Sequence, residues 1–403
     1  MNRNDVSRRN FVGGAAAALG TLAIAPEVLA ARELHAAQRG IRRIPGGPPM
    51  LRALQSRVDE YDALAHLSSN ENPFGPSQKT LEAMTYAFKY SMRYGYPDND
   101  VQQRIADAHG VDREHLLLGA GSGEILEVVG LTYLGHGKKV IGVEPSYGSV
   151  YSHATGIDAD NVLLPLEPDH RQNVQRMVDA TNRNYRDVGF VYVCNPNNPT
   201  GVTMTAAEIE YLLDNIPEDV PVLIDEAYHH FVEDPEYEES IKYALEGRKV
   251  IIARTFSKLY GMAAMRIGFA IAPADMIQEM RAYSTGSVNA LARWGAVAGM
   301  QDTQAQKAIL DHNRKWREQT IADLAGLGYE SIPSQTNFFM VNLRQPVAPI
   351  RQAFRERKVA VGRDFPPMLD HLRVSIGTEE EMGRFMNAFE DILKTSVMSS
   401  QRG

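Results

Sequence analysis

The sequence predicts an α/β protein, with a large domain built on a mostly parallel sheet flanked by helices and a smaller α+β domain after it. Two observations predict this class. Between residues 116 and 271, short runs rich in Val, Ile and Leu alternate with stretches of helical periodicity, the pattern of parallel strands joined by crossover helices. Polar residues suited to chemistry follow these runs, where parallel strands deliver side chains to one edge of a sheet.

The expected elements follow in chain order. Six apolar runs are predicted to be strands of the large sheet, at residues 115–118, 140–143, 190–193, 220–224, 250–253 and 267–270. Residues 303–327 have the pattern of one long amphipathic helix, and residues 337–342, 359–362 and 372–376 resemble strands. We therefore expect an N-terminal arm at 31–70 that joins the smaller domain, a large domain at 71–300 and the smaller domain at 301–403.

Length and charge limit the possible partners. The chain has 403 residues, of which 44% are hydrophobic and 23% charged, so it is long enough for two domains with substantial cores. Its formal net charge of −8 argues against a general affinity for nucleic acid or anionic lipid. An anionic small molecule must then be held by a few well-placed cations.

The first 30 residues resemble a twin-arginine export signal. Ser7, Arg8, Arg9, Asn10, Phe11 and Val12 precede a mildly apolar stretch at residues 13–25. This pattern predicts a periplasmic or exported protein that meets the Tat translocon transiently. The apolar stretch is shorter than the roughly 20 residues of a membrane span, which argues against stable insertion. The alternative is an amphipathic first helix with two chance arginines in a cytoplasmic protein.

A glycine-rich turn follows the first predicted strand. Residues 118–124 read Leu-Gly-Ala-Gly-Ser-Gly-Glu and lead into an apolar-periodic helix, whose free backbone N–H groups can bind a phosphate. The candidate phosphate contacts are Gly121, Ser122 and Gly123.

The same turn is also compatible with a dinucleotide-binding fold, in which Glu144 would be the acid after the next strand of an NAD-dependent dehydrogenase. However, Glu124 occupies the position of the third glycine. A dehydrogenase would also leave the residues around Lys258 without a role.

Lys258 stands in the run Thr-Phe-Ser-Lys-Leu-Tyr-Gly at residues 255–261, shortly after an apolar strand. Ser257 and Arg266 offer a hydroxyl and a guanidinium for a phosphate, and Asp225 ends the preceding apolar run. A Schiff-base lysine, phosphate ligands and a carboxylate that keeps a pyridine nitrogen protonated are what a pyridoxal 5'-phosphate site requires. Desolvation and Arg266 should both lower the pKa of Lys258. The alternatives are a solvated surface lysine and an aspartate that caps the following helix.

Two further residues suit the phenolic oxygen of such a cofactor. Asn198 lies in the turn Asn-Pro-Asn-Asn-Pro-Thr-Gly at residues 195–201, and Tyr228 follows Asp225 by about one helical turn. Both can donate a hydrogen bond to that oxygen, which lowers the pKa of the Lys258 imine. Considered alone, residues 195–201 are an ordinary proline-rich turn.

Arginines near the C-terminus suggest how a substrate is held. Arg373 lies within a short predicted strand, and its guanidinium matches an α-carboxylate bidentately, which makes it the natural clamp for that group. The alternative is a surface ion pair. Arg363 is a second possible anion contact. The histidines show no metal-ligand spacing, so no metal is predicted, and His229 and His230 are expected on a helix surface or at the edge of the core.

Together these motifs resemble the fold-type I pyridoxal phosphate aminotransferases of class I and II, and among them the histidinol-phosphate aminotransferase branch. The resemblance runs from residue 67 to 382. It is carried by residues 70–75, 96–98, 119–124, 145–148, 197–201, 225–228, 255–268 and 372–378.

The resemblance implies a role for each matching residue. It implies an internal aldimine at Lys258, with Asp225 at the ring nitrogen and Tyr147 stacked on the ring. The phosphate contacts would be Gly121, Ser122, Gly123, Ser257 and Arg266, with Asn198 and Tyr228 at the phenolic oxygen. Arg373, Arg363 and Asn72 would meet the substrate. Family members are homodimers, so Tyr96 would reach the phosphate of the neighbouring subunit.

The implied reaction moves an amino group between an L-amino acid, or a histidinol-phosphate-like amine, and a 2-oxo acid. A lyase, cyclase or oxidase on the same scaffold remains an alternative, as does a non-catalytic scaffold that binds the cofactor.

Overall fold

The structure is a computed structural model that describes residues 57–400, with side chains described up to Leu393 except for His136. The predicted signal at residues 1–30 and the first part of the predicted arm lie outside these residues. Within residues 57–400, no helix combines the length and apolar character that crossing a membrane requires.

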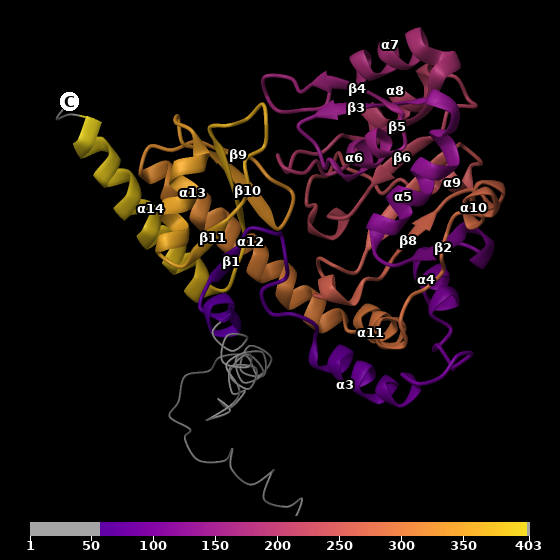
Figure 1. Cartoon of the computed structure of the whole chain (residues 1–403), viewed down its shortest axis with the longest axis horizontal. Helices are drawn as coiled ribbons and strands as arrows, with labels where there is room; N and C mark the ends of the chain where they lie inside the picture. Colours follow the sequence, from indigo (N-terminus) through magenta and orange to yellow (C-terminus); the bar gives the residue numbers. More distant parts are fainter. Residues whose placement is uncertain (1–56, 401–403) are drawn as a thin grey trace, which may run out of the picture. The chain divides into compact units, whose positions relative to one another are not determined.

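Seven strands form the large sheet, in the order β2-β8-β7-β6-β5-β3-β4 (Figure 1). Their bounds are β2 Leu116–Gly119, β3 Lys139–Glu144, β4 Asp160–Pro165, β5 Val188–Cys194, β6 Val222–Asp225, β7 Val250–Thr255 and β8 Gly268–Ile271. Strands β3 to β7 run parallel to one another, and β8 runs antiparallel to both β7 and β2. The mostly parallel α/β class is therefore confirmed.

Two details of the sheet differ from the expectation. The alternating pattern predicts β8 as another parallel strand, but only residues 256–267, with one short 3-10 turn at η7 Ala263–Met265, separate it from β7. Parallel neighbours are usually joined through an α-helix that crosses over the sheet, and this connection contains none, so the chain returns antiparallel. The pattern also misses the edge strand β4, whose residues are only partly buried and carry Asp, Asn and Pro.

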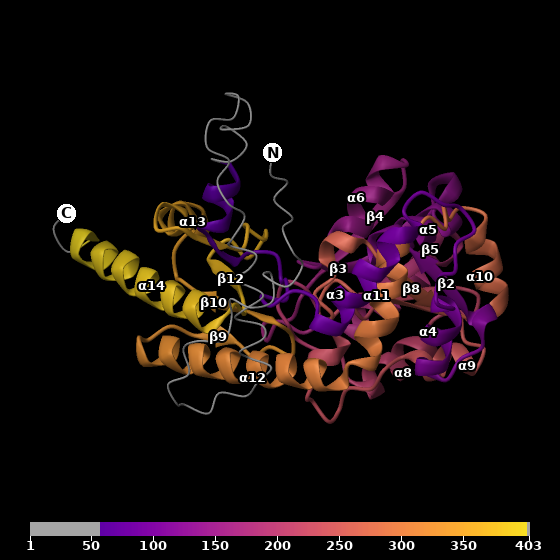
Figure 2. The same cartoon turned by 90° about the horizontal axis from the view of Figure 1, so that it is seen from below.

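Helices cover both faces of this sheet. One face packs against α4 Val101–His109, α7 Val174–Asn184, α8 Ala206–Asn215, α9 Ile241–Leu245 and α11 Ala290–Gln301. The other packs against α5 Ser122–Tyr133, α6 Ser149–Gly156 and α10 Ala274–Arg281. Helix α3, Gln78–Ala87, lies along α11 (Figure 2). Both cores take alternate side chains of the same strands, as the period of two in a buried strand requires.

Short polar residues start several of these helices. The side chains of Ser77, Asn173 and Asn289 each accept a hydrogen bond from the N–H of the third residue of α3, α7 and α11. Thr205 and Glu208 form a capping box at the start of α8. These residues satisfy backbone donors that a helix leaves unpaired, which explains where the elements begin.

The C-terminal part has its own core. Strands β9 Ser331–Ile332, β10 Phe338–Asn342 and β12 His371–Ser375 form an antiparallel sheet in the order β12-β10-β9. Strand β1, Ala65–Leu67, pairs in parallel with β11, Val359–Val361, and so brings the N-terminal segment into this part. Helices α12 Thr303–Gly326, α13 Val347–Glu356 and α14 Glu379–Ser400 complete it. The predicted helix at 303–327 and the three later strands are observed, whereas β1 and β9 are too short for the pattern to reveal them.

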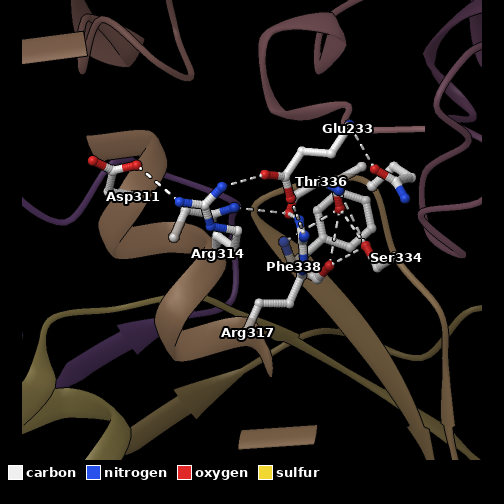
Figure 3. A network of polar contacts seen from close by, with 9 residues as sticks. Glu233, Asp311, Arg314, Arg317, Ser334, Thr336 and Phe338 are labelled. Atoms are coloured by element: carbon white, nitrogen blue, oxygen red, sulfur yellow. Dashed lines mark hydrogen bonds and ion pairs between the residues drawn. The ribbon is translucent and has the colours of Figure 1, made fainter. Parts of the chain in front are cut away.

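Helix α12 is attached to both parts of the fold by its arginines (Figure 3). Arg317 donates to the carbonyl of Thr336 at 3.0 Å and to Glu233 Oε2 at 3.2 Å. Arg314 reaches the other carboxylate oxygen of Glu233 at 2.9 Å. Because Glu233 follows η6 His229–Phe231 of the large part and Thr336 precedes β10, these contacts hold the two parts to the same helix.

Candidate active site

The predicted site residues converge at one edge of the large sheet. Asp225 is the last residue of β6, and Lys258 and Asn198 follow the ends of β7 and β5. Parallel strands end at the same edge, so these segments meet there. Arg266 reaches this edge from the other direction, because antiparallel β8 begins where its neighbours end. The reversal of β8, which the pattern does not predict, is thus what brings the guanidinium to the site.

Gly121 and Arg266 form a cradle at the start of α5. Gly121 has a φ of +83°, and a Cβ there would lie 2.2 Å from Arg266 Nη2, so a side chain at this position would strain the backbone and displace the guanidinium. Arg266 donates to the carbonyls of Ala263 at 2.8 Å and Ala120 at 3.3 Å. A positive guanidinium beside the N-terminus of a twelve-residue helix is suited to an anion.

Lys258 stays partly accessible although protein atoms surround it. Its Nζ donates to the carbonyl of Ser69 at 3.2 Å and lies 5.5 Å from the ring centre of Tyr228. Burial, and after it the charge of Arg373, lower the pKa of Lys258 to about 8. Arg266 contributes in the same direction, as predicted, but less than Arg373. The amine is therefore not a solvated surface group, and it can lose its proton within about one pH unit of neutrality.

Asp225 is buried without a cationic hydrogen-bond partner among residues 57–393. Its Oδ1 accepts from the amide of Ala227 and its Oδ2 from the hydroxyl of Tyr192, each at 3.2 Å. Burial raises the pKa of Asp225 to about 6, and the charge of Lys258 opposes this shift. Asp225 does not cap an α-helix, since a turn and the 3-10 helix η6 follow it. A cation that reached this carboxylate would relieve the desolvation.

Asn198 and Tyr228 lie side by side between Lys258 and Arg373. Arg373 Nη1 donates to Asn198 Oδ1 at 2.6 Å, which turns the amide nitrogen of Asn198 towards the hydroxyl of Tyr228 at 3.4 Å. Asn70 donates to the same hydroxyl at 2.9 Å. Two amide donors thus meet at the Tyr228 hydroxyl, which leaves the hydrogen of that hydroxyl for an acceptor such as an oxyanion.

Arg373 is not in a surface ion pair. Arg373 is 7% exposed, and its Nη2 donates to the carbonyl of Ser68 at 2.6 Å, while its Nε has no hydrogen-bond partner among the described residues. Burial lowers the pKa of Arg373 to about 10. Phe365 lies 4.7 Å from its guanidinium carbon and 4.3 Å from that of the exposed Arg363. A buried guanidinium without a carboxylate among the described residues is suited to an acidic ligand.

Other predicted residues have different surroundings. Tyr147 is 39% exposed, and burial followed by the charge of Asp225 raises its pKa, so the two residues are close. Asn72 donates to the carbonyl of Leu259 at 2.8 Å and accepts the amide of Phe74 at 3.0 Å. The amide nitrogen of Asn72 therefore holds the backbone next to Lys258, and its amide oxygen holds the backbone of its own segment.

Tyr96 does not meet the site of its own chain. Its hydroxyl donates to the carbonyl of Val288 at 3.3 Å, and its ring stacks on Tyr90. The paired histidines lie at the edge of the core, one of the two expected places: His229 is 8% exposed, and the half-buried His230 contacts the Tyr260 hydroxyl at 3.2 Å.

The site contains polar residues that the sequence analysis did not assign. The side-chain oxygen of Asn70 accepts a hydrogen bond from Ser375 Oγ at 2.9 Å, and the backbone N–H of Asn70 donates to the same hydroxyl at 2.8 Å. Asn70 is the first residue of the motif at residues 70–75, so the sequence already indicated this segment as part of the site. Tyr192 carried no signal, since within strand β5 it reads as one more core residue.

These residues fit pyridoxal 5'-phosphate. The cradle at Gly121 and Arg266 suits its phosphate, Asp225 its ring nitrogen and Lys258 its aldehyde. Among residues 57–393, no cluster of three or more His, Cys, Asp or Glu side chains is arranged to hold a metal ion.

Comparison with known proteins agrees with this fit. The family model for aminotransferases of class I and II matches residues 63–389. The histidinol-phosphate aminotransferase of Maricaulis maris is 33% identical over 81% of this chain and 91% of its own length. That of Moorella thermoacetica is 31% identical over 87% of this chain and 90% of its own length.

Solved structures share the fold. The crystal structure of histidinol-phosphate aminotransferase from Sinorhizobium meliloti in complex with pyridoxal-5'-phosphate superimposes with a TM-score of 0.78. The match covers 88% of this chain and 100% of the Sinorhizobium meliloti chain, at 22% sequence identity. The dehydrogenase alternative is thereby excluded, and the chain belongs to the class I and II aminotransferases, the pyridoxal phosphate-dependent transaminases.

Proposed function

We propose that this aminotransferase moves an amino group between an L-amino acid, or a histidinol-phosphate-like amine, and a 2-oxo acid. The observation that carries the proposal is the Lys258 amine, whose pKa is lowered to about 8 and which acts electrostatically on Asp225. When bound, pyridoxal 5'-phosphate supplies an electron sink for the charge left on a substrate carbon that loses its proton. The names of the relatives favour the histidinol-phosphate-like amine as one donor.

Different residues would serve as the base and as the contacts of the cofactor ring. We infer that Lys258 Nζ takes the α-proton of the substrate, because a neutral amine near pH 8 is a competent base. The Asp225 carboxylate would keep the ring nitrogen protonated, and Asn198 with Tyr228 would donate to the phenolic oxygen.

Anion contacts complete the proposed site. The phosphate would be held by Gly121, Ser122, Gly123, Ser257 and Arg266. Arg373 would bind the substrate carboxylate through two parallel N–H groups, with Arg363 as a second cation near Phe365. The backbone contacts of Asn72 favour a role in holding the Lys258 segment rather than in binding substrate.

The test replaces Lys258 with Ala. The variant should still bind the cofactor, because the phosphate contacts remain, but transamination should fall to background because no base is left. Borohydride should fix the cofactor covalently to wild type and to a Lys307→Ala control, but not to Lys258→Ala. Near-normal turnover of Lys258→Ala would refute the assignment, and a coloured protein that never responds to amino donors would indicate a non-catalytic scaffold.

We also propose that the enzyme is a homodimer. Three exposed apolar side chains between α3 and α4 support this: Phe88 at 59%, Met92 at 71% and Tyr94 at 105% relative exposure. Apolar side chains gathered in this way favour a partner surface. Tyr96, in the same segment, would then reach the phosphate in the neighbouring subunit.

We further propose export through the twin-arginine signal at Arg8 and Arg9. Replacing both with Lys should retain the enzyme in the cytoplasm, because that route requires the arginine pair. Cell fractionation of the variant and wild type measures this. Unchanged export of the Lys-Lys variant would exclude the proposal.

A further inference from the structure

Asp225 is held by a residue from the neighbouring strand. In the parallel register of β5 and β6, Tyr192 is opposite Leu223, and Cys194 is opposite Asp225. Since side chains alternate along a strand, Tyr192 and Asp225 share one face of the sheet and are diagonal neighbours. The phenol spans this diagonal and donates its hydroxyl to Asp225 Oδ2 at 3.2 Å.

The ring of Tyr192 is itself fixed. Tyr192 is fully buried, and its ring meets that of Tyr151 edge-on, with 5.6 Å between the ring centres. The hydroxyl of Tyr151 is bonded to both the N–H and the C=O of Val143, each at 3.1 Å. A Cβ on Gly142 would lie 2.2 Å from that hydroxyl, so glycine makes the room for Tyr151. The packing therefore holds the Tyr192 hydroxyl in one place beside Asp225.

The two oxygens of Asp225 have different partners. Oδ1 accepts a backbone amide, which any residue at position 227 other than proline supplies, whereas Oδ2 depends on the side chain of Tyr192. Each carboxylate oxygen has two lone pairs, so one hydrogen bond per oxygen leaves acceptor capacity for a further donor. The hydrogen bond from Tyr192 also favours the ionised carboxylate against the desolvation of a fully buried position.

We propose that Tyr192 is a positioning residue that orients the Asp225 carboxylate towards the ring nitrogen of the cofactor and keeps it ionised there. The inference rests on the proposed function, which assigns Asp225 to that nitrogen. Tyr192 acts on the reaction through Asp225 and touches neither Arg373 nor Lys258 by any hydrogen bond of the described structure. It should therefore affect the chemical step and leave substrate binding unchanged.

The test compares Tyr192→Phe with Tyr243→Phe in the holoenzyme. Tyr243 is another buried tyrosine, 3% exposed, on the opposite face of the sheet, and its hydroxyl donates to the carbonyl of Ala206 at 3.4 Å. The readouts are the pH midpoint of the bound cofactor's visible absorbance, kcat and KM. Without the phenol, Asp225 becomes more basic, the ring nitrogen holds its proton less firmly and the ring withdraws fewer electrons.

Tyr192→Phe should move the absorbance midpoint to higher pH by about half a unit or more, and lower kcat about tenfold, as expected for one hydrogen bond to a charged group. KM should stay within about twofold of wild type, because the substrate clamp is intact. Tyr243→Phe should change none of the three values. A Tyr192→Phe enzyme with the midpoint and kcat of wild type would overturn the inference.

A double-mutant cycle separates this role from simple packing. Tyr192→Phe should add no further shift of the absorbance midpoint in an Asp225→Asn background, because its effect passes through the carboxylate. An equal shift in both backgrounds would refute the positioning role. If wild type itself bound the cofactor with no covalent link at Lys258, the proposed function would fail, whereas a normal link with an unaffected Tyr192→Phe variant would reject only the role of Tyr192.

Discussion

At the scale of single residues, burial and nearby positive charges set the pKa of the Lys258 amine. Lys258 reacts only when it is neutral, and its pKa of about 8 lies below that of an ordinary lysine first because of burial and then because of Arg373. Because the pKa is lowered, the neutral form predominates above about pH 8. Arg373 therefore has two separable effects. Its positive charge lowers the pKa of Lys258, and its two parallel N–H groups can bind a substrate carboxylate.

Two substitutions of Arg373 should separate these effects. Arg373→Met and Arg373→Lys should both lower kcat/KM for carboxylate substrates on the order of 100-fold, because each loses the bidentate contact. Only Arg373→Met should raise the pKa of Lys258, since lysine at this position keeps the charge. The rate at which apoenzyme captures pyridoxal 5'-phosphate, followed against pH, measures that pKa.

Arg355→Met, on the exposed face of α13, is the matched control for the loss of a positive charge. An identical capture profile for Arg373→Met and wild type would show that burial alone sets the Lys258 pKa.

At the scale of elements, a buried ion pair joins the ends of β6 and β7 behind the site. Arg254 donates to Glu226 through Nε at 3.0 Å and Nη2 at 2.6 Å, and both side chains are almost fully buried. Glu226 also accepts the amide of Ser240 at 2.8 Å. Because Glu226 follows Asp225, and Arg254 precedes Lys258 by four residues, the pair holds together the two strands that carry the site.

Breaking this pair should destabilise the fold. Arg254→Met leaves the Glu226 charge buried without its partner and should lower the free energy of unfolding by about 3–5 kcal/mol. The double variant Arg254→Met with Glu226→Leu should recover most of that loss. Urea denaturation of the apoenzymes measures both.

The second carboxylate at Arg254 provides the control. Glu239 contacts Arg254 Nη2 at 2.7 Å, but its side chain is 52% exposed, so Glu239→Gln should change stability by less than about 1 kcal/mol. A larger loss for Glu239→Gln than for Arg254→Met would contradict this ranking.

At the scale of the whole molecule, completion of the site by a second subunit is the prediction to test. Lys258→Ala and Tyr96→Phe homodimers should each be impaired, the first for lack of the base and the second for lack of a phosphate contact. In a mixed dimer, one site combines a natural Lys258 with a natural Tyr96 from the other subunit. Mixing and refolding the two variants should therefore restore activity.

Activity that merely equals the sum of the two separate variants would place Tyr96 within its own subunit or outside the site. A mixture of Lys258→Ala with Asn198→Ala is the control. If both residues serve the same subunit's site, that mixture should regain nothing, because no site contains both natural residues.

Much of the architecture could be predicted because burial on both faces leaves a local pattern. The runs that form β3, β5, β6 and β7 are continuous in apolar residues, and the side chains after them meet because parallel strands end together. The edge strand β4 was not predicted, because its residues are partly exposed and therefore do not form a continuous apolar run. The direction of β8 depended on a connection that contains no crossover α-helix.

By itself, the sequence determined the α/β class, the family and the segments that meet at the sheet edge, because these depend on local patterns of apolar and turn residues. Only the tertiary structure decided that Arg373 is buried, that β8 brings Arg266 to the site and that Tyr192 holds Asp225. The last contact joins residues 33 positions apart in the chain. It depends on the register of two strands, and register arises from packing of the whole sheet rather than from any short stretch of sequence.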